Sequence, residues 1–192
     1  MAELVDTPHG PARVHLHLVD SPRAALVLGH GAGGGVASAD LVAATEAAND
    51  AGMTVALVEQ PYRVAGRRSP APAHQLDAAW IAVVPQLFPN LLLIVGGRSA
   101  GARVACRTAA DTGATAVLCL AFPLHPPGKP EKTRLPELDA VTVPTLVVQG
   151  ERDPFGIPSP GANRKVVLVP GTHSLRSSAA IASAVSDWLA RL

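Results

Sequence analysis

The chain has 192 residues, which at about 100–200 residues per domain predicts a single domain over residues 1–192. The 16 lysines and arginines almost balance the 15 aspartates and glutamates, so the formal net charge of +1 argues against nucleic-acid binding, which needs a basic surface. Hydrophobic residues make up 48% of the chain but aromatic residues only 3%, so alanine, valine and leucine must supply most of the core.

Three further features of the sequence indicate the cellular compartment of the protein. Cys106 and Cys119 are too few for a disulfide scaffold or a zinc ribbon, and their apolar surroundings are typical of buried residues. The N-terminal segment has neither the basic region nor the apolar stretch of a signal peptide. The apolar runs at 91–95 and 116–122 are far shorter than the roughly 20 residues that cross a bilayer. We therefore expect a cytoplasmic protein without a membrane span.

Short apolar segments recur along the chain. Residues 13–19 alternate in polarity, as in an exposed or edge antiparallel strand. Further strands, continuous and rich in valine and leucine, are expected at 24–28, 54–58, 91–95, 116–120, 145–148 and 165–169. Alanine-rich segments with helical spacing occupy 40–51, 73–87, 100–110 and 179–192. This alternation predicts an α/β protein, a three-layer α/β/α sandwich around a mostly parallel sheet.

A Gly-x-Ser-x-Gly motif stands between a predicted strand and a predicted helix. It reads Gly97-Arg98-Ser99-Ala100-Gly101. A serine on such a sharp turn is held above the sheet at a helix N-terminus, and the glycines let neighbouring chain pass closely. The motif predicts Ser99 as a catalytic nucleophile, against the alternative of an ordinary helix-capping serine.

A serine nucleophile needs a base, and the base needs a carboxylate to orient it. Asp153 and His173 each follow a predicted strand, in the chain order that a strand-turn-helix serine requires. We assign His173 as the general base and Asp153 as the orienting acid. Glu151 is the alternative acid, but Pro154 stiffens the loop at Asp153. The histidines that fit the order less well are His9, His15, His17, His74 and His125.

The first predicted buried strand ends in a second glycine-rich segment, residues 29–35. Small residues there allow backbone N–H groups to converge on a developing oxyanion. We expect the N–H groups of Ala32 and Ala100 to form this oxyanion hole, with His30 bracing the loop. The same glycines also fit a nucleotide-binding Gly-x-Gly-x-x-Gly pattern, with Glu59 after the next strand as the ribose ligand.

These motifs together resemble the α/β-hydrolase superfamily over nearly the whole chain. The sequence Gly-Gly-Arg-Ser-Ala-Gly, the segment 120–129 and the short length resemble a branch of small predicted hydrolases related to dienelactone-hydrolase-like enzymes. The resemblance implies a Ser-His-Asp serine hydrolase without a cofactor or metal. The chain departs from dienelactone hydrolases in having Ser99 where they carry cysteine, and it has no room for a large cap.

The expected reaction is hydrolysis of a small-molecule carboxylic ester or thioester through an acyl-enzyme on Ser99. Two other classes stay open, a non-catalytic binding protein with this fold and a nucleotide-binding α/β protein. Arg63, Arg98 and the pair at 67–68 could recognise an anionic group. The side chain of Arg98 could equally brace the turn at Ser99, and a pair such as 67–68 more often lies on the solvated surface. The proline-rich segment 123–136 is expected to be either a surface loop or a lid over the site.

Overall fold

The computed structural model describes residues 2–192. Eight strands form one sheet in the order β1-β2-β4-β3-β5-β6-β7-β8. The strands are β1 (Ala2–Val5), β2 (Ala12–His17), β3 (Ala24–Gly29), β4 (Met53–Glu59), β5 (Leu93–Arg98), β6 (Ala116–Leu120), β7 (Thr145–Gly150) and β8 (Arg164–Val169). The helices are α1 (Ala39–Asp50), α2 (Pro61–Val64), α3 (Ala73–Leu87), α4 (Ala100–Thr108), α5 (Leu135–Asp139) and α6 (Ser178–Leu189).

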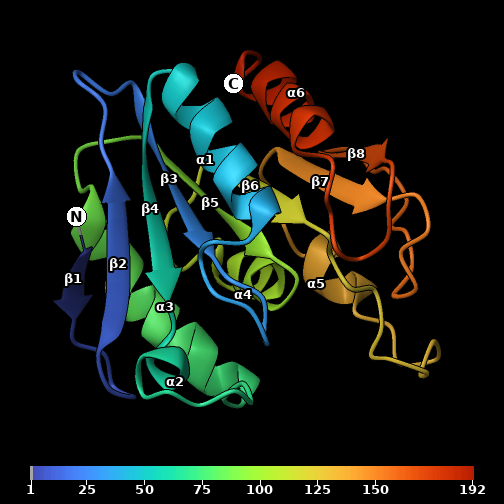
Figure 1. Cartoon of the computed structure of the whole chain (residues 1–192), viewed down its shortest axis with the longest axis horizontal. Coiled ribbons are helices and arrows are strands. Elements are labelled where there is room, and N and C mark those ends of the chain that lie inside the picture. The colour runs from blue at the N-terminus through green and yellow to red at the C-terminus, as the bar shows by residue number, and fades with distance from the viewer. Residues whose placement is uncertain (1) are drawn as a thin grey trace.

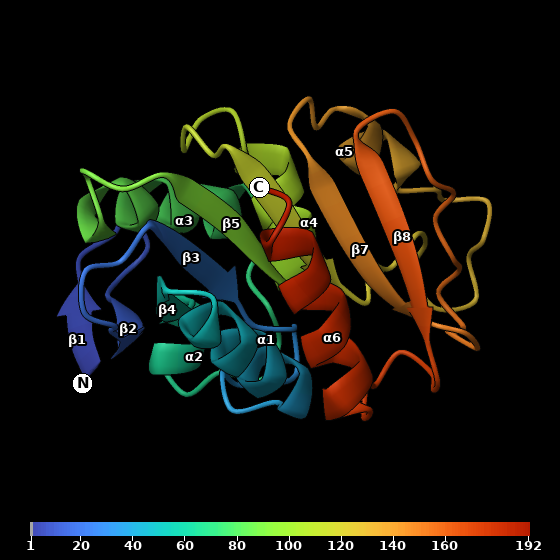
Figure 2. The ribbon, with the colours of Figure 1, turned by 90° about the horizontal axis from the view of Figure 1, so that it is seen from above.

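The helices cover both faces of this sheet (Figures 1 and 2). Viewed from above, α1 and α6 lie side by side on one face, and α3 and α4 lie on the other. The strands from β4 to β8 are mutually parallel with β3, whereas β2 pairs antiparallel with both β1 and β4. The predicted three-layer α/β/α sandwich with a mostly parallel sheet is confirmed.

Each face of the sheet has its own apolar cluster, because successive side chains of a strand point to opposite faces. Leu26 and Leu28 pack in the cluster under α1 and α6, whereas Val27 between them packs in the cluster under α3 and α4. Both faces of the central strands are thus buried, which explains their continuous apolar sequences. Cys106 and Cys119 are buried as expected, with their sulfur atoms 3.5 Å apart.

The antiparallel end of the sheet differs from the prediction. The alternating segment forms β2 over Ala12–His17 rather than 13–19, and it is not an edge strand. Its outer neighbour is β1, whose pairing runs from Ala2 opposite His15 to Val5 opposite Ala12. The four residues of β1 are exposed except for the partly buried Val5 and carry no hydrophobic pattern, so β1 was not predicted. The short helices α2 and α5, of 4 and 5 residues, were also missed.

Strand β5 begins and ends later than the predicted segment 91–95. It runs through Gly96 and Gly97, which pair with β6 on one side and with β3 on the other. A Cβ atom at Gly96 would overlap the carbonyl oxygen of Leu118. Close strand packing, rather than hydrophobicity, therefore selects these residues, and Ser99 follows directly after the last residue of the strand.

Within residues 2–192, no helix is long and apolar enough to cross a membrane.

Candidate active site

Ser99 lies at the turn between β5 and α4 in a strained backbone conformation. Its φ of 52° and ψ of −106° are unusual for a residue with a side chain. The Ser99 N–H donates to the carbonyl oxygen of Leu120 at 2.9 Å, which ties the turn to β6. Cβ atoms at Gly97 or Gly101 would overlap the carbonyl oxygen of Gly29. The two motif glycines are therefore required so that β3 and α4 can approach the turn.

His173 and Asp153 lie beside this serine although they are far away in sequence. Nε2 of His173 is 2.9 Å from Oγ of Ser99, and Nδ1 is 2.9 Å from Oδ2 of Asp153. An ionised carboxylate can only accept, so Nδ1 carries the proton and Nε2 faces the serine hydroxyl as an acceptor. The structure thus brings together the three residues that the sequence predicted as nucleophile, base and acid.

The carboxylate of Asp153 is buried and held from several sides. Its Oδ2 also accepts from Nε2 of Gln149 at 2.8 Å, and its Oδ1 accepts from the N–H of Phe155 at 2.9 Å. The rings of Phe155 and His173 in turn pack edge to face, with centroids 4.5 Å apart. Glu151, the alternative acid, is exposed to solvent. The geometry therefore favours Asp153 as the partner of the histidine.

Arg98, whose role the sequence left open, clamps the loop that carries His173. Its Nη2 donates to the backbone carbonyl of His173 at 3.2 Å, and its Nε donates to Oδ2 of Asp40 at 2.9 Å. Asp40 is 2% exposed, and its Oδ1 accepts from the N–H of Leu41 at the start of α1. A Cβ atom at Gly31 would lie 2.7 Å from Nη1 of Arg98. This glycine therefore leaves room for the guanidinium group.

The loop after β3 carries Ala32, the predicted oxyanion donor. Its backbone carbonyl accepts from the Tyr62 hydroxyl at 2.8 Å, and Nε2 of His30 accepts from the N–H of Gln60 at 3.1 Å. Burial lowers the pKa of His30 and raises the pKa of Tyr62 to about 12. Both side chains therefore stay uncharged near neutral pH, and His30 braces the loop. Ala100, the second predicted donor, is the first residue of α4.

Ser99, His173, Ala32 and Ala100 line one cavity of about 430 Å³, within the usual size range of small-molecule sites. The proline-rich segment 123–136 contributes to its wall. The remaining lining residues are Gly33, Pro70, Ala71, Ala73, Leu76, Arg98, Arg103, Arg107, Pro123, His125, Pro127, Arg134 and Phe155. Within residues 2–192, no group of three or more His, Cys, Asp or Glu side chains is arranged to hold a metal ion.

Three arginines of the cavity were missed in the sequence. Arg103 and Arg107 follow Ser99 by four and eight residues in α4, a spacing that puts them on one helix face and could have revealed them. Arg134 lies just before α5 and has no such signal. By contrast, Arg63 and the exposed pair at 67–68 do not line this cavity.

The nucleotide-binding alternative placed Glu59 beside a ribose. In the structure, Oε2 of Glu59 is 3.1 Å from Nη1 of Arg13 and 3.1 Å from Nε2 of His15, both on the neighbouring strand β2. The hydrogen bonds from His15 and Arg13 outweigh burial and lower the pKa of this carboxyl group. Glu59 thus serves to join two strands at the antiparallel end of the sheet.

A family model described as an alpha/beta hydrolase domain matches residues 22–176, most of the chain. The chain belongs to this family of alpha/beta hydrolases. No curated protein sequence matches it significantly.

Solved alpha/beta hydrolases share its fold. XC6422 from Xanthomonas campestris, described as an α/β serine hydrolase without a lid, has a TM-score of 0.77 and 20% identity, covering 100% of this chain and 94% of that one. Est1E from Butyrivibrio proteoclasticus also has a TM-score of 0.77, with 17% identity and coverage of 99% and 98%. Dienelactone hydrolase from Anabaena variabilis has a TM-score of 0.76, with 18% identity and coverage of 100% and 96%. The predicted superfamily and the minimal fold without a large cap are confirmed.

Proposed function

We propose that the chain is a serine hydrolase that cleaves a small carboxylic ester or thioester through an acyl-enzyme on Ser99. One observation carries this proposal, the unbroken chain of hydrogen bonds from Oγ of Ser99 through His173 to Asp153. The strained turn supports it, because such strain persists where the surrounding structure fixes a functional geometry. We further propose a single domain over residues 1–192 that works in the cytoplasm without a cofactor.

In the first half of the reaction, Oγ of Ser99 attacks the carbonyl carbon while Nε2 of His173 takes the hydroxyl proton. The Oγ–C bond forms and the carbonyl π electrons move to the oxygen. The N–H groups of Ala32 and Ala100 donate to this oxyanion, for neither donates to a protein acceptor elsewhere in residues 2–192. Asp153 stabilises the imidazolium and keeps Nε2 directed at the serine.

The tetrahedral intermediate then collapses. The C–O or C–S bond to the leaving group breaks, and His173 gives its proton to the departing oxygen or sulfur. In the second half, His173 removes a proton from water, the resulting hydroxide attacks the acyl carbon, and the Oγ–C bond breaks. The carboxylic acid leaves, and His173 returns the proton to Ser99.

Hydrolysis of p-nitrophenyl acetate tests this proposal. Ser99→Ala removes the nucleophile, so kcat should fall by about a thousandfold or more. The matched control is Ser186→Ala on the exposed side of α6, which should keep the activity of the parent protein. Equal turnover by Ser99→Ala and its parent would overturn the assignment. A folded parent protein that is inert to activated esters would favour the non-catalytic binding protein.

A further inference from the structure

Besides Arg98, three arginines line the cavity beside Ser99. Arg103 is four residues beyond Ser99, so with a helical rise of 1.5 Å per residue their Cα atoms are roughly 6 Å apart along the axis. Side chains of a helix lean toward its N-terminus, which directs Arg103 back toward the serine. Arg107 follows one turn later, and Arg134 comes from the segment that precedes α5. The backbone N–H of Arg134 donates to the carbonyl oxygen of Leu124 at 2.6 Å.

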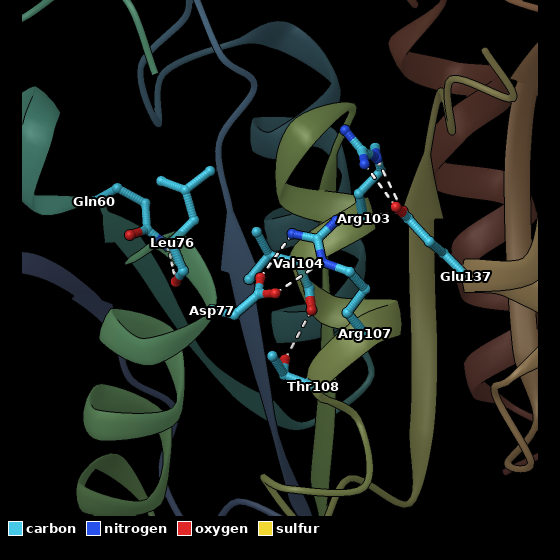
Figure 3. A network of polar contacts seen from close by, with 8 residues as sticks. All are labelled: Gln60, Leu76, Asp77, Arg103, Val104, Arg107, Thr108 and Glu137. Carbon is cyan, nitrogen blue, oxygen red and sulfur yellow. Dashed lines mark hydrogen bonds and ion pairs between the residues drawn. The ribbon is translucent and has the colours of Figure 1, made fainter. Parts of the chain in front are cut away.

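Two carboxylates compensate part of this charge (Figure 3). Nε and Nη2 of Arg103 bind the two oxygens of Glu137 at 2.9 and 2.6 Å. Nε and Nη2 of Arg107 bind Asp77 at 2.8 and 2.6 Å, and its Nη1 lies 3.3 Å from Glu137. Figure 3 shows the guanidinium of Arg103 joined to Glu137, with one nitrogen directed away from that carboxylate. Among residues 2–192, the hydrogen bonds of the Arg103 guanidinium use Nε and Nη2, so its Nη1 group is available for a ligand.

Arg134 has no carboxylate partner among residues 2–192. Burial and the neighbouring charges of Arg103 and Arg107 lower its pKa, and Glu137 opposes this only in part. Three guanidinium groups thus face two carboxylates in a partly buried cavity. Arg98 does not change this balance, because Asp40 already neutralises it. An excess positive charge in such a place is costly unless an anion joins it, and arginine forks match carboxylate and phosphate oxygens well.

Resting on the proposed function, we infer that the substrate carries a carboxylate or phosphate group besides its scissile ester. Arg134 and the free Nη1 group of Arg103 bind this anion along α4 while the ester carbonyl lies at Ser99. Arg107 holds Asp77 and Glu137 so that neither carboxylate approaches the anion. The protein is therefore selective for anionic esters over neutral ones of equal size.

A pair of near-isosteric esters tests this selectivity. The mono-p-nitrophenyl ester of adipic acid carries a distal carboxylate, and its terminal carboxamide is the neutral counterpart. The parent protein should show a kcat/KM about 10 to 100 times higher for the acid, as expected for hydrogen bonds to a charged group. Arg134→Gln should lower this ratio about tenfold, because the acid loses a charged hydrogen-bond donor that the amide uses less. Arg191→Gln, at the exposed C-terminal end, should keep the ratio of the parent protein.

Two further esters in the same assay identify the anionic group. The p-nitrophenyl ester of phosphonobutyric acid replaces the carboxylate by a phosphonate, and p-acetoxybenzoate moves the carboxylate to the leaving group. If kcat/KM is higher for one of these esters than for the adipic acid ester, the comparison identifies which anionic group the arginines bind and on which side of the scissile bond it lies. Equal kcat/KM for every charged ester and for the amide in the parent protein would overturn the inference. An unchanged ratio in Arg134→Gln would overturn it as well.

Binding to the Ser99→Ala variant separates this inference from the proposed function. Calorimetric titration of that variant with adipate and with inorganic phosphate should detect binding of at least one anion, weakened about tenfold by Arg134→Gln. If the anion binds in this way but the parent protein hydrolyses no ester, the anion site stands and the proposed function fails. If neither anion binds and charged esters are still hydrolysed, the anion site fails and the proposed function stands.

Discussion

Two glycine-rich turns face the same cavity, but they use glycine for different reasons. In the turn after β5, Cβ atoms at Gly97 and Gly101 would overlap the carbonyl oxygen of Gly29. In the turn after β3, Cβ atoms at Gly33, Gly34 and Gly35 would meet nothing within 4 Å. The first turn is packed to its limit, whereas the second is close to Arg98 only at Gly31 and leaves open space after Ala32.

The comparison separates two requirements of the proposed chemistry. The nucleophile has to be held in one strained position, and tight packing on three strands provides that. The predicted oxyanion donor has to present a bare N–H group to a substrate, and small residues with free space around them allow a carbonyl oxygen to approach. A count of glycines in the sequence does not distinguish these two roles, but the contacts do.

The largest expected effect comes from filling the packed turn. Gly101→Ala forces a methyl group against the backbone of Gly29, where no side chain can move aside. We expect a loss of about 3 kcal/mol or more in the free energy of unfolding, or no folded protein. Thermal and urea denaturation measure this loss. A variant as stable as the parent protein would show that the turn can relax.

A smaller effect should follow from weakening the contacts of Arg98, which joins Asp40 to the loop that carries His173. Arg98→Lys keeps a positive charge near Asp40 but loses the second donor that reaches the carbonyl of His173. We expect kcat to fall about tenfold at nearly constant KM, because His173 is positioned less well while the cavity keeps its charge. Steady-state kinetics with p-nitrophenyl acetate and a melting curve test this prediction. A lower melting temperature with an unchanged kcat would show that Arg98 has only a structural role.

The bracing histidine of the turn after β3 should make stability depend on pH. Burial lowers the pKa of His30 below its ordinary value of 6.5, so at acidic pH the unfolded chain binds a proton there that the folded chain does not. The stability contributed by neutral His30 is complete above about pH 6.5 and is lost as the pH falls toward the lowered pKa. Between pH 7.5 and 5.5 we expect the free energy of unfolding to fall by at most about 1.4 kcal/mol, because pH 5.5 lies one unit below the ordinary pKa of 6.5.

His30→Gln is the matched variant for this pH effect. It should have lower stability than the parent protein at pH 7.5 but a smaller further loss at pH 5.5, because glutamine does not titrate. Urea unfolding at the two pH values gives both numbers. The same pH dependence in variant and parent protein would place the effect at another group.

The smallest effect is expected in the open turn. Gly34→Ala adds a methyl group where no atom lies within 4 Å, and its backbone is not in the left-handed region. The free energy of unfolding should stay within about 0.5 kcal/mol of the parent value. A loss as large as that of Gly101→Ala would erase the difference between the two turns.

Much of the site was predictable because its motifs combine local geometry with chain order. Ser99 was found from two glycines and a strand-helix junction, and His173 from its place after the last strand. Asp153 was preferred to Glu151 for its stiffer loop, and the structure turns its carboxylate toward His173. The nearly continuous apolar strands likewise predicted the parallel sheet, since burial on both faces leaves no alternation.

The features that were not predicted depend on contacts between residues far apart in the sequence, and no local sequence pattern contains such contacts. The clamp between Arg98 and Asp40 joins residues 58 positions apart. Arg134 approaches Arg103 only because the segment before α5 folds back beside α4. Strand β1 exists because β2 offers it an edge to pair with, not because its own side chains are buried. The exposed pair at 67–68 was considered as an anion-binding group, whereas Arg103 and Arg107 were overlooked although their helical spacing is visible in the sequence.

Labelling with a fluorophosphonate tests the central claim most directly, since the reagent forms an Oγ–P bond with an activated serine and releases fluoride. Intact-mass and peptide analysis should locate a single adduct on Ser99 in the parent protein. Ser99→Ala should stay unlabelled while Ser186→Ala reacts at the rate of the parent. Equal labelling of Ser99→Ala, or a folded parent protein that does not react, would contradict the account.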